Sequence, residues 1–255
     1  MKNKIIVLMM ALMIVGLAAG NAAASEWEAI GGLAITETTL DVWNDVIDDL
    51  NYSFENGFKN ESGSVIPTRN EEEVDNIDRV PMLYLGARKE INDKWTEELR
   101  YEYIFGTVEG EAEAVIAGNT PADFVWQKQE AKIDVKLHGI TALADYQFND
   151  RWTVGGGIGF YKGTKNKDFE GAIFQAINAS GAKVTPDDKD FDLDAVSYRL
   201  GVGYEKPFAE NWDFNANLDY LYMEIDDEDD GNIYSNGFSY GVGVKLIVSK
   251  LDKFV

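Results

Sequence analysis

Most of the chain after residue 25 alternates between apolar and polar residues with a period of two, the pattern of β-strands that have one apolar face. From Leu99 to Phe105, for example, large apolar side chains occupy the odd positions, and Arg100 and Glu102 stand between them. Eight segments carry this alternation. We therefore predict eight strands, near residues 26–37, 79–91, 95–108, 130–148, 152–162, 194–205, 212–225 and 234–250.

The connections between these strands alternate in length. Three are short polar turns that end in tryptophan, with the sequences INDKW, FNDRW and FAENW, and their tryptophans lie 57 and 60 residues apart. The others are longer and often strongly acidic, and they span residues 38–78, 109–129, 163–193 and 226–233. This pattern predicts an up-and-down antiparallel arrangement with short turns at one end and long loops at the other.

Two of the long connections carry apolar residues at helical spacing. Leu40, Trp43, Ile47 and Leu50 follow a candidate cap at Thr38 or Thr39, and we predict a helix over about residues 39–51, packed over the barrel mouth. A weaker helical pattern is formed by Phe169, Ile173, Phe174 and Ile177.

The segment 130–148 breaks its own alternation. Ile133 and Leu137 mark the apolar face of its first half, whereas the apolar residues from Ala142 onward have the opposite parity. One extra residue in a strand exchanges its two faces. We therefore predict a β-bulge near His138-Gly139.

Two closed arrangements fit eight such strands: a soluble ligand-carrying barrel with the apolar face inside, and a membrane barrel with that face outside. The interior of an eight-stranded barrel only just holds its own side chains. The aromatic residues of the apolar face would overfill it, whereas the opposite face is rich in glycine. Four tryptophans open odd-numbered strands and so lie at one rim, as aromatic side chains do at a membrane interface. We predict a transmembrane β-barrel with an interfacial aromatic belt of Trp27, Trp95, Trp152 and Trp212.

The first 24 residues differ from the rest of the chain. Lys2 and Lys4 precede an apolar run that ends near Ala19, and Ala22-x-Ala24 forms a small-residue cleavage site. We predict a signal peptide over residues 1–24 and one barrel domain over residues 25–255. Removal of the signal peptide changes the formal charge from −22 to −24, which argues against partners such as nucleic acid or anionic lipid. The chain has no cysteine, so it cannot form disulfides.

The polar face of the strands, turned inward, would make a charged interior. Opposite charges on neighbouring strands can pair, which buried charges require. We predict a network that fills the lumen and fixes the strand register, and the alternative is a narrow water- or solute-conducting path lined by the same groups. The predicted network consists of Glu28, Arg88, Glu90, Glu98, Arg100, Glu102, Lys132, Asp134, Lys136, His138, Arg199, Asp213, Asp219 and Lys245.

The eight alternating strands, the NDxW-type turns at one end and the longer loops at the other resemble the small bacterial outer-membrane β-barrel proteins, the OmpA/OmpX/OmpW-like superfamily. The resemblance implies an all-β fold, an eight-stranded antiparallel up-and-down transmembrane β-barrel with long, acidic, partly helical extracellular loops. It also implies periplasmic termini and turns, and partners in outer-membrane lipid and the barrel assembly machinery. We expect a monomer. Family members commonly end in an aromatic residue, whereas here Phe254 is penultimate.

Two features could carry chemistry, and neither completes a site. His138 is the only histidine, and no motif places a serine beside it; Ser197 and Ser239 lie on other strands. The loop Asp226–Gly231 begins like a calcium loop, but Gly237 stands where a bidentate glutamate is wanted. We therefore expect no cofactor, no catalytic residue and no metal site, with at most weak attraction of divalent cations to the acidic loops, including Asp187, Asp188, Asp190, Asp192 and Asp194.

The sequence thus predicts an integral outer-membrane protein with a structural or surface-interaction role and no enzyme activity. A narrow channel for small solutes is the first alternative, and a lipid-modifying enzyme is the second. A soluble ligand-carrying barrel comes last.

Overall fold

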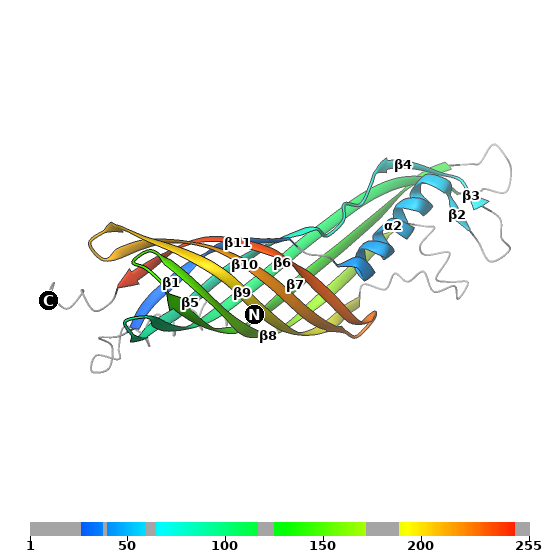
Figure 1. The fold of residues 1–255 in the computed structure, drawn as a ribbon. Coiled ribbons are helices and arrows are strands. Elements are labelled where there is room, and N and C mark those ends of the chain that lie inside the picture. The colour runs from blue at the N-terminus through cyan, green and yellow to red at the C-terminus, as the bar shows by residue number, and fades with distance from the viewer. Residues whose placement is uncertain (1–26, 38–39, 60–64, 117–124, 172–188, 248–255) are drawn as a thin grey trace, which may run out of the picture.

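The barrel is built from eight long strands that each pair with their neighbours in the chain. In this computed structural model, residues 27–37, 40–59, 65–116, 125–171 and 189–247 are described. The barrel strands are β1 (Trp27–Glu37), β5 (Arg79–Asn92), β6 (Trp95–Ile116), β7 (Val125–Gln147), β8 (Trp152–Glu170), β9 (Lys189–Ala209), β10 (Trp212–Asp227) and β11 (Gly231–Ile247). All pairs are antiparallel, and pairing of β1 with β11 closes the barrel. The predicted eight-stranded up-and-down barrel is confirmed (Figure 1).

The asparagines of the first two turns explain why these turns recur. The Asn92 side-chain oxygen accepts hydrogen bonds from the backbone N–H groups of Lys94 (3.0 Å) and Trp95 (3.1 Å). Asn149 makes the equivalent bonds to Arg151 and Trp152, at 2.9 and 3.0 Å. A side chain that bonds to the backbone two residues on stabilises a tight turn. We call this end of the barrel the turn end and the opposite one the loop end.

At the loop end, β6 and β7 run past the other strands and form a protrusion with the segment that follows β1 (Figure 1). The strand β4 (Thr68–Glu72) pairs with β6, and the short β2 (Phe58–Lys59) pairs with β3 (Val65–Ile66). The ends of β6, β7 and β8 at Ile116, Val125 and Glu170 lie well beyond the predicted ends. We use protrusion for residues 40–59, 65–78, 107–116 and 125–134.

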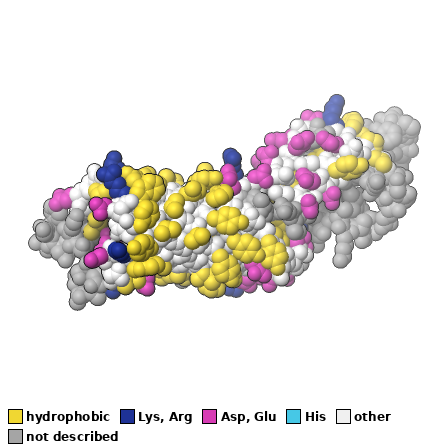
Figure 2. Space-filling view, viewed as in Figure 1, with side chains coloured by type: hydrophobic (Ala, Val, Ile, Leu, Met, Phe, Trp, Pro, Cys, Tyr) yellow, Lys and Arg dark blue, Asp and Glu magenta, His cyan; other side chains and the backbone are white. Residues whose placement is uncertain are grey.

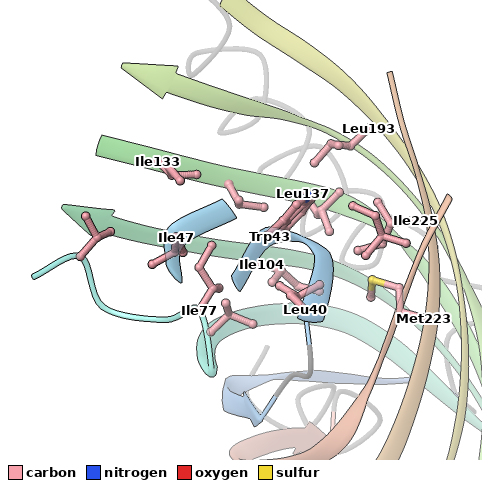
Figure 3. Close-up of a cluster of buried hydrophobic side chains, with 14 of the residues drawn as sticks. Leu40, Trp43, Ile47, Ile77, Ile104, Ile133, Leu137, Leu193, Met223 and Ile225 are labelled. Carbon is pink, nitrogen blue, oxygen red and sulfur yellow. The ribbon is translucent and has the colours of Figure 1, made fainter. Parts of the chain in front are cut away.

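Helix α2 (Asp41–Asn56) begins at the mouth of the barrel and runs along the protrusion, where it packs against β4 and β6 (Figures 1 and 3). Leu40 occupies the cap position without a side-chain hydrogen bond, while Thr38 and Thr39 lie outside the described residues. At its other end the helix stops at Gly57, whose φ of 92° suits glycine. The Asn51 side chain forms two hydrogen bonds of 2.9 Å with the Val74 backbone, which tie the helix to the strand-free segment before β5.

The outer wall of the barrel is apolar around its middle, and acidic side chains gather toward the loop end and the protrusion (Figure 2). Within the described residues, no helix is long and apolar enough to cross a bilayer. The predicted signal peptide, most of the second helical pattern and Phe254 lie outside the described residues and remain predictions.

Candidate functional site: the barrel lumen and its mouth

The lumen begins at the turn end with a layer of charged side chains. The Lys245 Nζ lies 3.0 Å from a carboxylate oxygen of Glu205, 3.1 Å from Asp213 and 3.3 Å from Glu28. Arg88 pairs with the other oxygen of Glu205. These residues come from β1, β5, β9, β10 and β11, so the layer joins strands on different sides of the barrel. Each charge has an opposite charge beside it, as side chains withdrawn from water require.

Glu102 is the centre of a second layer, farther into the lumen. Its side chain is fully buried, and its Oε2 accepts hydrogen bonds from Arg199 (2.9 Å), Thr141 (2.9 Å) and Tyr161 (2.5 Å). On the far side of the Arg199 guanidinium, Asp219 lies 3.8 Å from Nη1. The five side chains come from the five consecutive strands β6 to β10, so they span the lumen and fix the relative positions of these strands.

Aromatic and amide groups fill the space between the two layers. The Arg100 guanidinium lies over the Tyr84 ring, 4.6 Å from its centre, and pairs with Glu98. The Tyr84 hydroxyl donates a hydrogen bond of 3.1 Å to Asn215. The cavity left among these residues has a volume of about 40 Å³. Such a space holds only a few water molecules.

At the loop end, apolar side chains take over from the charged ones. Trp43, Ile47 and Phe54 of α2 are at most 2% exposed, and Figure 3 shows Trp43 and Ile47 among the apolar side chains of the surrounding strands. We call α2 with these side chains the helix plug. The barrel wall meets it with Ile104, Ile133, Val135, Leu137, Leu193, Leu221, Met223, Ile225 and Ile233. The helix plug therefore closes the mouth with a hydrophobic core.

A buried lysine fastens the helix plug to the surrounding strands. Lys165 of β8 has no exposed surface, and its Nζ donates hydrogen bonds of 2.5 Å to both Asp227 and Asp230. Asp227 is equally buried and also accepts a hydrogen bond of 2.9 Å from the indole Nε1 of Trp43. The ammonium group lies 5.5 Å from the Trp43 ring centre and 5.2 Å from that of Phe191. We call Lys165, Asp227, Asp230 and Trp43 the latch.

Lys167 and Asp229 extend the latch toward solvent, beyond the apolar part of the barrel wall. The Lys167 Nζ lies 2.6 Å from Asp229 and 3.4 Å from Asp230. Burial alone would raise the pKa of Asp229, but the hydrogen bond from Lys167 and the charges of Lys167 and Lys165 hold it below the ordinary 3.8. Burial would likewise lower the pKa of Lys167, but Asp229 and Asp230 hold it above the ordinary 10.5.

Tryptophans mark the turn end on the outer wall. Trp95 and Trp152 are each 44% exposed and Trp212 is 39% exposed. The Trp95 ring lies edge-on to Tyr146, with 5.2 Å between ring centres. The backbone of Trp27 opens β1 at the same end, but its side chain lies outside the described part of the structure. Aromatic rings in this position are typical of a membrane interface.

A comparison with protein families decides what this closed barrel is. The model of the family described as outer membrane protein beta-barrel domain matches residues 9–245. The chain belongs to this family. It is an integral outer-membrane β-barrel protein, and its localisation in the outer membrane agrees with the apolar wall. No curated protein matches the sequence.

Solved structures of small outer-membrane barrels are similar in fold to this family member. Neisserial surface protein A is 13% identical, with 86% of this chain and 96% of that chain covered and a TM-score of 0.42. Ail, the attachment invasion locus protein of Yersinia pestis, is 14% identical, with coverage of 87% and 99% and a TM-score of 0.40. OprG from Pseudomonas aeruginosa is 15% identical, with coverage of 87% and 95% and a TM-score of 0.38. At these levels none of them bears on the function of this outer-membrane barrel.

The structure divides the predicted charge network into two groups. Glu90, at the rim of the turn end, is exposed rather than enclosed, because the end of β5 runs past the layer around Lys245. Lys132, Asp134, Lys136 and His138 lie on the outer wall of β7, so the prediction of inward positions was wrong for these four. The structure brings together inside the lumen Glu28, Arg88, Glu98, Arg100, Glu102, Arg199, Asp213, Asp219 and Lys245.

The outward position of these four residues has a single cause. β7 keeps one register against β6 and β8 along its whole length, so the predicted β-bulge near His138-Gly139 is absent. The residues between the four are Ile133, Val135 and Leu137, and they point inward because the helix plug offers them an apolar partner. A face that looked lipid-exposed in the sequence is therefore the wall of an internal core.

Several residues of the lumen and the latch were not predicted from the sequence. Tyr161 lies on the inward face of the predicted strand 152–162 but was not included in the network, and Lys165 has the same parity beyond residue 162, where the strand was predicted to stop. Glu205 was predicted to lie at the end of a strand, where it had no assigned face. Asp227 was assigned to a solvated acidic loop, although its parity continues from Met223 and Ile225, which also point inward. Longer predicted strands would have placed Lys165 and Asp227 on the inward face, whereas Tyr161 and Glu205 already lay within predicted strands.

The acidic loop after β10 does not form a metal site among the described residues. Asp227, Asp229 and Asp230 instead surround the ammonium groups of Lys165 and Lys167. Of the other acids expected to attract cations, Asp190, Asp192 and Asp194 lie on β9, and Asp187 and Asp188 lie outside the described residues.

Proposed function

We propose that this outer-membrane barrel is a closed structural protein that presents its protrusion at the cell surface, and that it neither conducts solutes nor catalyses a reaction. The observation that carries the proposal is the helix plug, whose inward side chains pack into a continuous apolar core in the barrel mouth. Water and ions gain nothing from entering a close-packed apolar core.

A second obstacle lies in series with the helix plug. The layer around Glu102 crosses the lumen with four further side chains, and the cavity below it has a volume of only about 40 Å³. A conducting path would have to break the pair between Glu102 and Arg199 as well as displace α2. These two requirements disfavour the alternative of a narrow solute channel.

The positions of the candidate catalytic groups argue against a lipid-modifying enzyme. His138 is exposed on the outer wall, whereas Ser197 and Ser239 are fully buried in the lumen. A general base must lie within hydrogen-bond reach of the nucleophile that it activates. The barrel wall separates this histidine from both serines.

Planar-bilayer recording tests the closed lumen. We expect no conductance steps from the wild-type barrel, nor from a variant in which a flexible glycine-serine linker replaces residues 41–56. Steps should appear only when this replacement is combined with Glu102→Ala and Arg199→Ala. The control is Asp48→Asn/Asp49→Asn, which changes two exposed residues of α2 and should stay silent. Regular steps from the wild-type protein would contradict the proposal and support the channel.

Labelling of intact cells tests whether the protrusion faces outward. The chain has no cysteine, so each introduced cysteine is unique. A membrane-impermeant maleimide should label Glu55→Cys, on the exposed side of α2, without permeabilisation. Arg151→Cys, in a short turn, should be labelled only after permeabilisation. The opposite result would place the protrusion in the periplasm and would refute a role at the cell surface.

A further inference from the structure

The outer wall of β7 and β8 changes character within two consecutive cross-strand pairs. Ile140 faces Phe160 across the two strands, and these side chains are 52% and 59% exposed, as lipid-facing residues are. The next pair toward the loop end on the same face is His138 with Lys162, both exposed. The pair after that is Lys136 with Thr164. Four hydrogen-bond donors therefore form a rectangle directly above the apolar wall.

This rectangle is an exception on a strongly acidic protein. We compare, on each strand, the first polar residue that points outward beyond the apolar wall. This residue is His138 on β7 and Lys162 on β8. On the other strands, only Arg79 is basic, and it pairs with Glu37 at 3.4 Å. The remaining residues in this position are acidic or neutral: Glu37 on β1, Thr107 on β6, Asp194 on β9, Glu224 on β10 and Asn236 on β11.

The cations of the rectangle are only partly neutralised. Lys162 pairs with Asp194 at 2.8 Å, but both side chains are largely exposed and such a pair is weak in water. Lys136 and His138 form no ion pair within the described residues. Asp134, the nearest acid along β7, accepts a hydrogen bond from Thr107 on the neighbouring strand. The rectangle thus keeps donors available for an anion.

Aromatic rings border the rectangle on the β6 side. Tyr103 faces His138 across the strands and stacks on Phe105, with 5.4 Å between ring centres. The Tyr101 ring lies 6.3 Å from the His138 ring. Tyrosine and phenylalanine in such a position belong at the boundary between acyl chains and headgroups. The donors therefore lie at the height where lipid phosphates lie, and lysine side chains can extend to reach them.

We propose that Lys136, His138, Lys162 and Thr164 bind the phosphate group of a lipid in the outer leaflet, whose acyl chains lie against Ile140 and Phe160. Cross-strand neighbours are about 5 Å apart and neighbours along one face about 7 Å, a spacing that lets several donors reach one phosphate. The inference rests on the proposed function in one respect, that the loop end faces outward.

The overall charge of the chain decides between a lipid and a dissolved anion. A formal charge of −22 repels phosphate in solution, which is the reason the sequence argued against anionic partners. The acyl chains of a lipid hold it against the barrel wall whatever its headgroup. The short-range attraction of two lysines and an imidazole then acts on a phosphate that the bilayer already holds beside them. The site would therefore select among membrane lipids.

Native mass spectrometry of the full-length barrel in dodecyl maltoside micelles tests this proposal. The probes are lipid A with its two phosphates and lipid A from which the phosphates have been removed. We expect the wild type to retain the phosphorylated form in preference, and Lys136→Gln/Lys162→Gln to bind it roughly 30-fold more weakly, from the usual contribution of two lysines near a membrane surface. The matched control is Lys94→Gln/Arg151→Gln, which removes two exposed cations at the turn end and should bind as the wild type does.

Three results would overturn the proposal: equal binding by the double variant and the wild type, displacement of the lipid by an excess of inorganic phosphate, or loss of binding in EDTA. Loss of binding in EDTA would mean that a divalent cation, bound by acids such as Asp134 and Asp194, bridges the protein and the lipid phosphate. A conducting wild-type barrel would refute the closed-lumen function without changing this titration, because the rectangle lies on the outer wall. Labelling that placed the protrusion in the periplasm would leave the affinity for the phosphorylated lipid unchanged. It would refute only the assignment of that lipid to the outer leaflet.

Discussion

Replacing Lys165 with methionine removes the charge of the latch while keeping a side chain of similar length. Lys165 and Asp227 both have no exposed surface, and the ammonium group is the only cation that contacts Asp227 in the described structure. The variant leaves this carboxylate buried with hydrogen bonds from the Trp43 indole and the Asp229 backbone N–H, each 2.9 Å long. Removal of one partner from a buried ion pair costs about 3–5 kcal/mol, because the other charge stays out of water.

The assay is hydrogen exchange of the α2 amides in micelles, together with guanidinium unfolding of the whole barrel. We expect Lys165→Met to accelerate exchange in α2 by an amount that matches this cost, since the helix plug is held by Trp43. Lys165→Met/Asp227→Asn should recover most of the loss, because the amide still accepts the indole hydrogen bond and carries no charge.

The matched control is Lys128→Met in the protrusion. Lys128 also pairs with carboxylates, Glu111 and Glu130, but its side chain is 53% exposed. Exposed pairs of this kind often contribute nothing measurable, so its exchange and unfolding should equal those of the wild type. If Lys165→Met behaved like this control, or if the double variant were no more stable than the single one, the latch would not be what holds the helix plug.

Three further predictions concern the lumen, the protrusion and pH. Glu102→Ala should lower the free energy of unfolding in guanidinium by about 3–5 kcal/mol, because it removes the carboxylate that lies 2.9 Å from Arg199. Asp219→Ala should lower it by less, because it removes only the carboxylate at 3.8 Å, and the reverse order would contradict this ranking. Gly110→Ala should lower the free energy of unfolding by about 1–3 kcal/mol in the same titration, since the added carbon would lie 2.6 Å from the Val74 side chain and 2.9 Å from the carbonyl oxygen of Glu72 in β4. Gly106→Ala should cost less, because the nearest atom there is a side-chain carbon of Val80 at 3.1 Å. The pKa of Asp229 is lowered in the folded state, so its contribution to stability is complete above the ordinary pKa of 3.8 and is lost as pH falls through the folded value. The NMR signal of the Asp229 side-chain carboxyl carbon should therefore stay unchanged from pH 7 to about 5 and shift only below about pH 4, and a shift near neutral pH would refute this assignment.

Much of the barrel could be predicted from local patterns because each pattern has one dominant physical cause. The alternation of residues 212–222 reflects a wall between lipid and lumen, and Asn92 and Asn149 reflect turns that need a side-chain acceptor. The helical spacing of Trp43 and Ile47 reflects a buried helix face, and α2 is observed at Asp41–Asn56. The inward charges near the turn end also follow from alternation, because the side chains that meet in that part of the lumen in the described structure come from the strands themselves.

The rest could not be predicted, because alternation does not reveal what lies on either side of a strand. Residues 109–116 alternate between glutamate and small apolar residues, which looks too polar for a membrane strand. In the structure Ala112 and Ala114 are buried in the protrusion, while Glu111 and Glu113 point outward. The latch was missed because residues 163–193 and 226–233 were predicted to be loops, and alternation assigns no inward face to Lys165 or Asp227 there.

The apparent change of parity in β7 marks the edge of the membrane rather than a bulge. Toward the turn end the outward face is apolar and the inward face polar, and beyond His138 both faces exchange their character while the register stays constant. The same exchange occurs in β10, where outward Tyr222 gives way to Glu224 and inward Asp219 gives way to Leu221. Below this height the strand separates lipid from a polar lumen, and above it the strand separates water from the helix plug. A barrel strand that runs past the bilayer must therefore exchange its two faces if its interior is filled with a hydrophobic core, and the residue where it does so reports the height of the lipid headgroups.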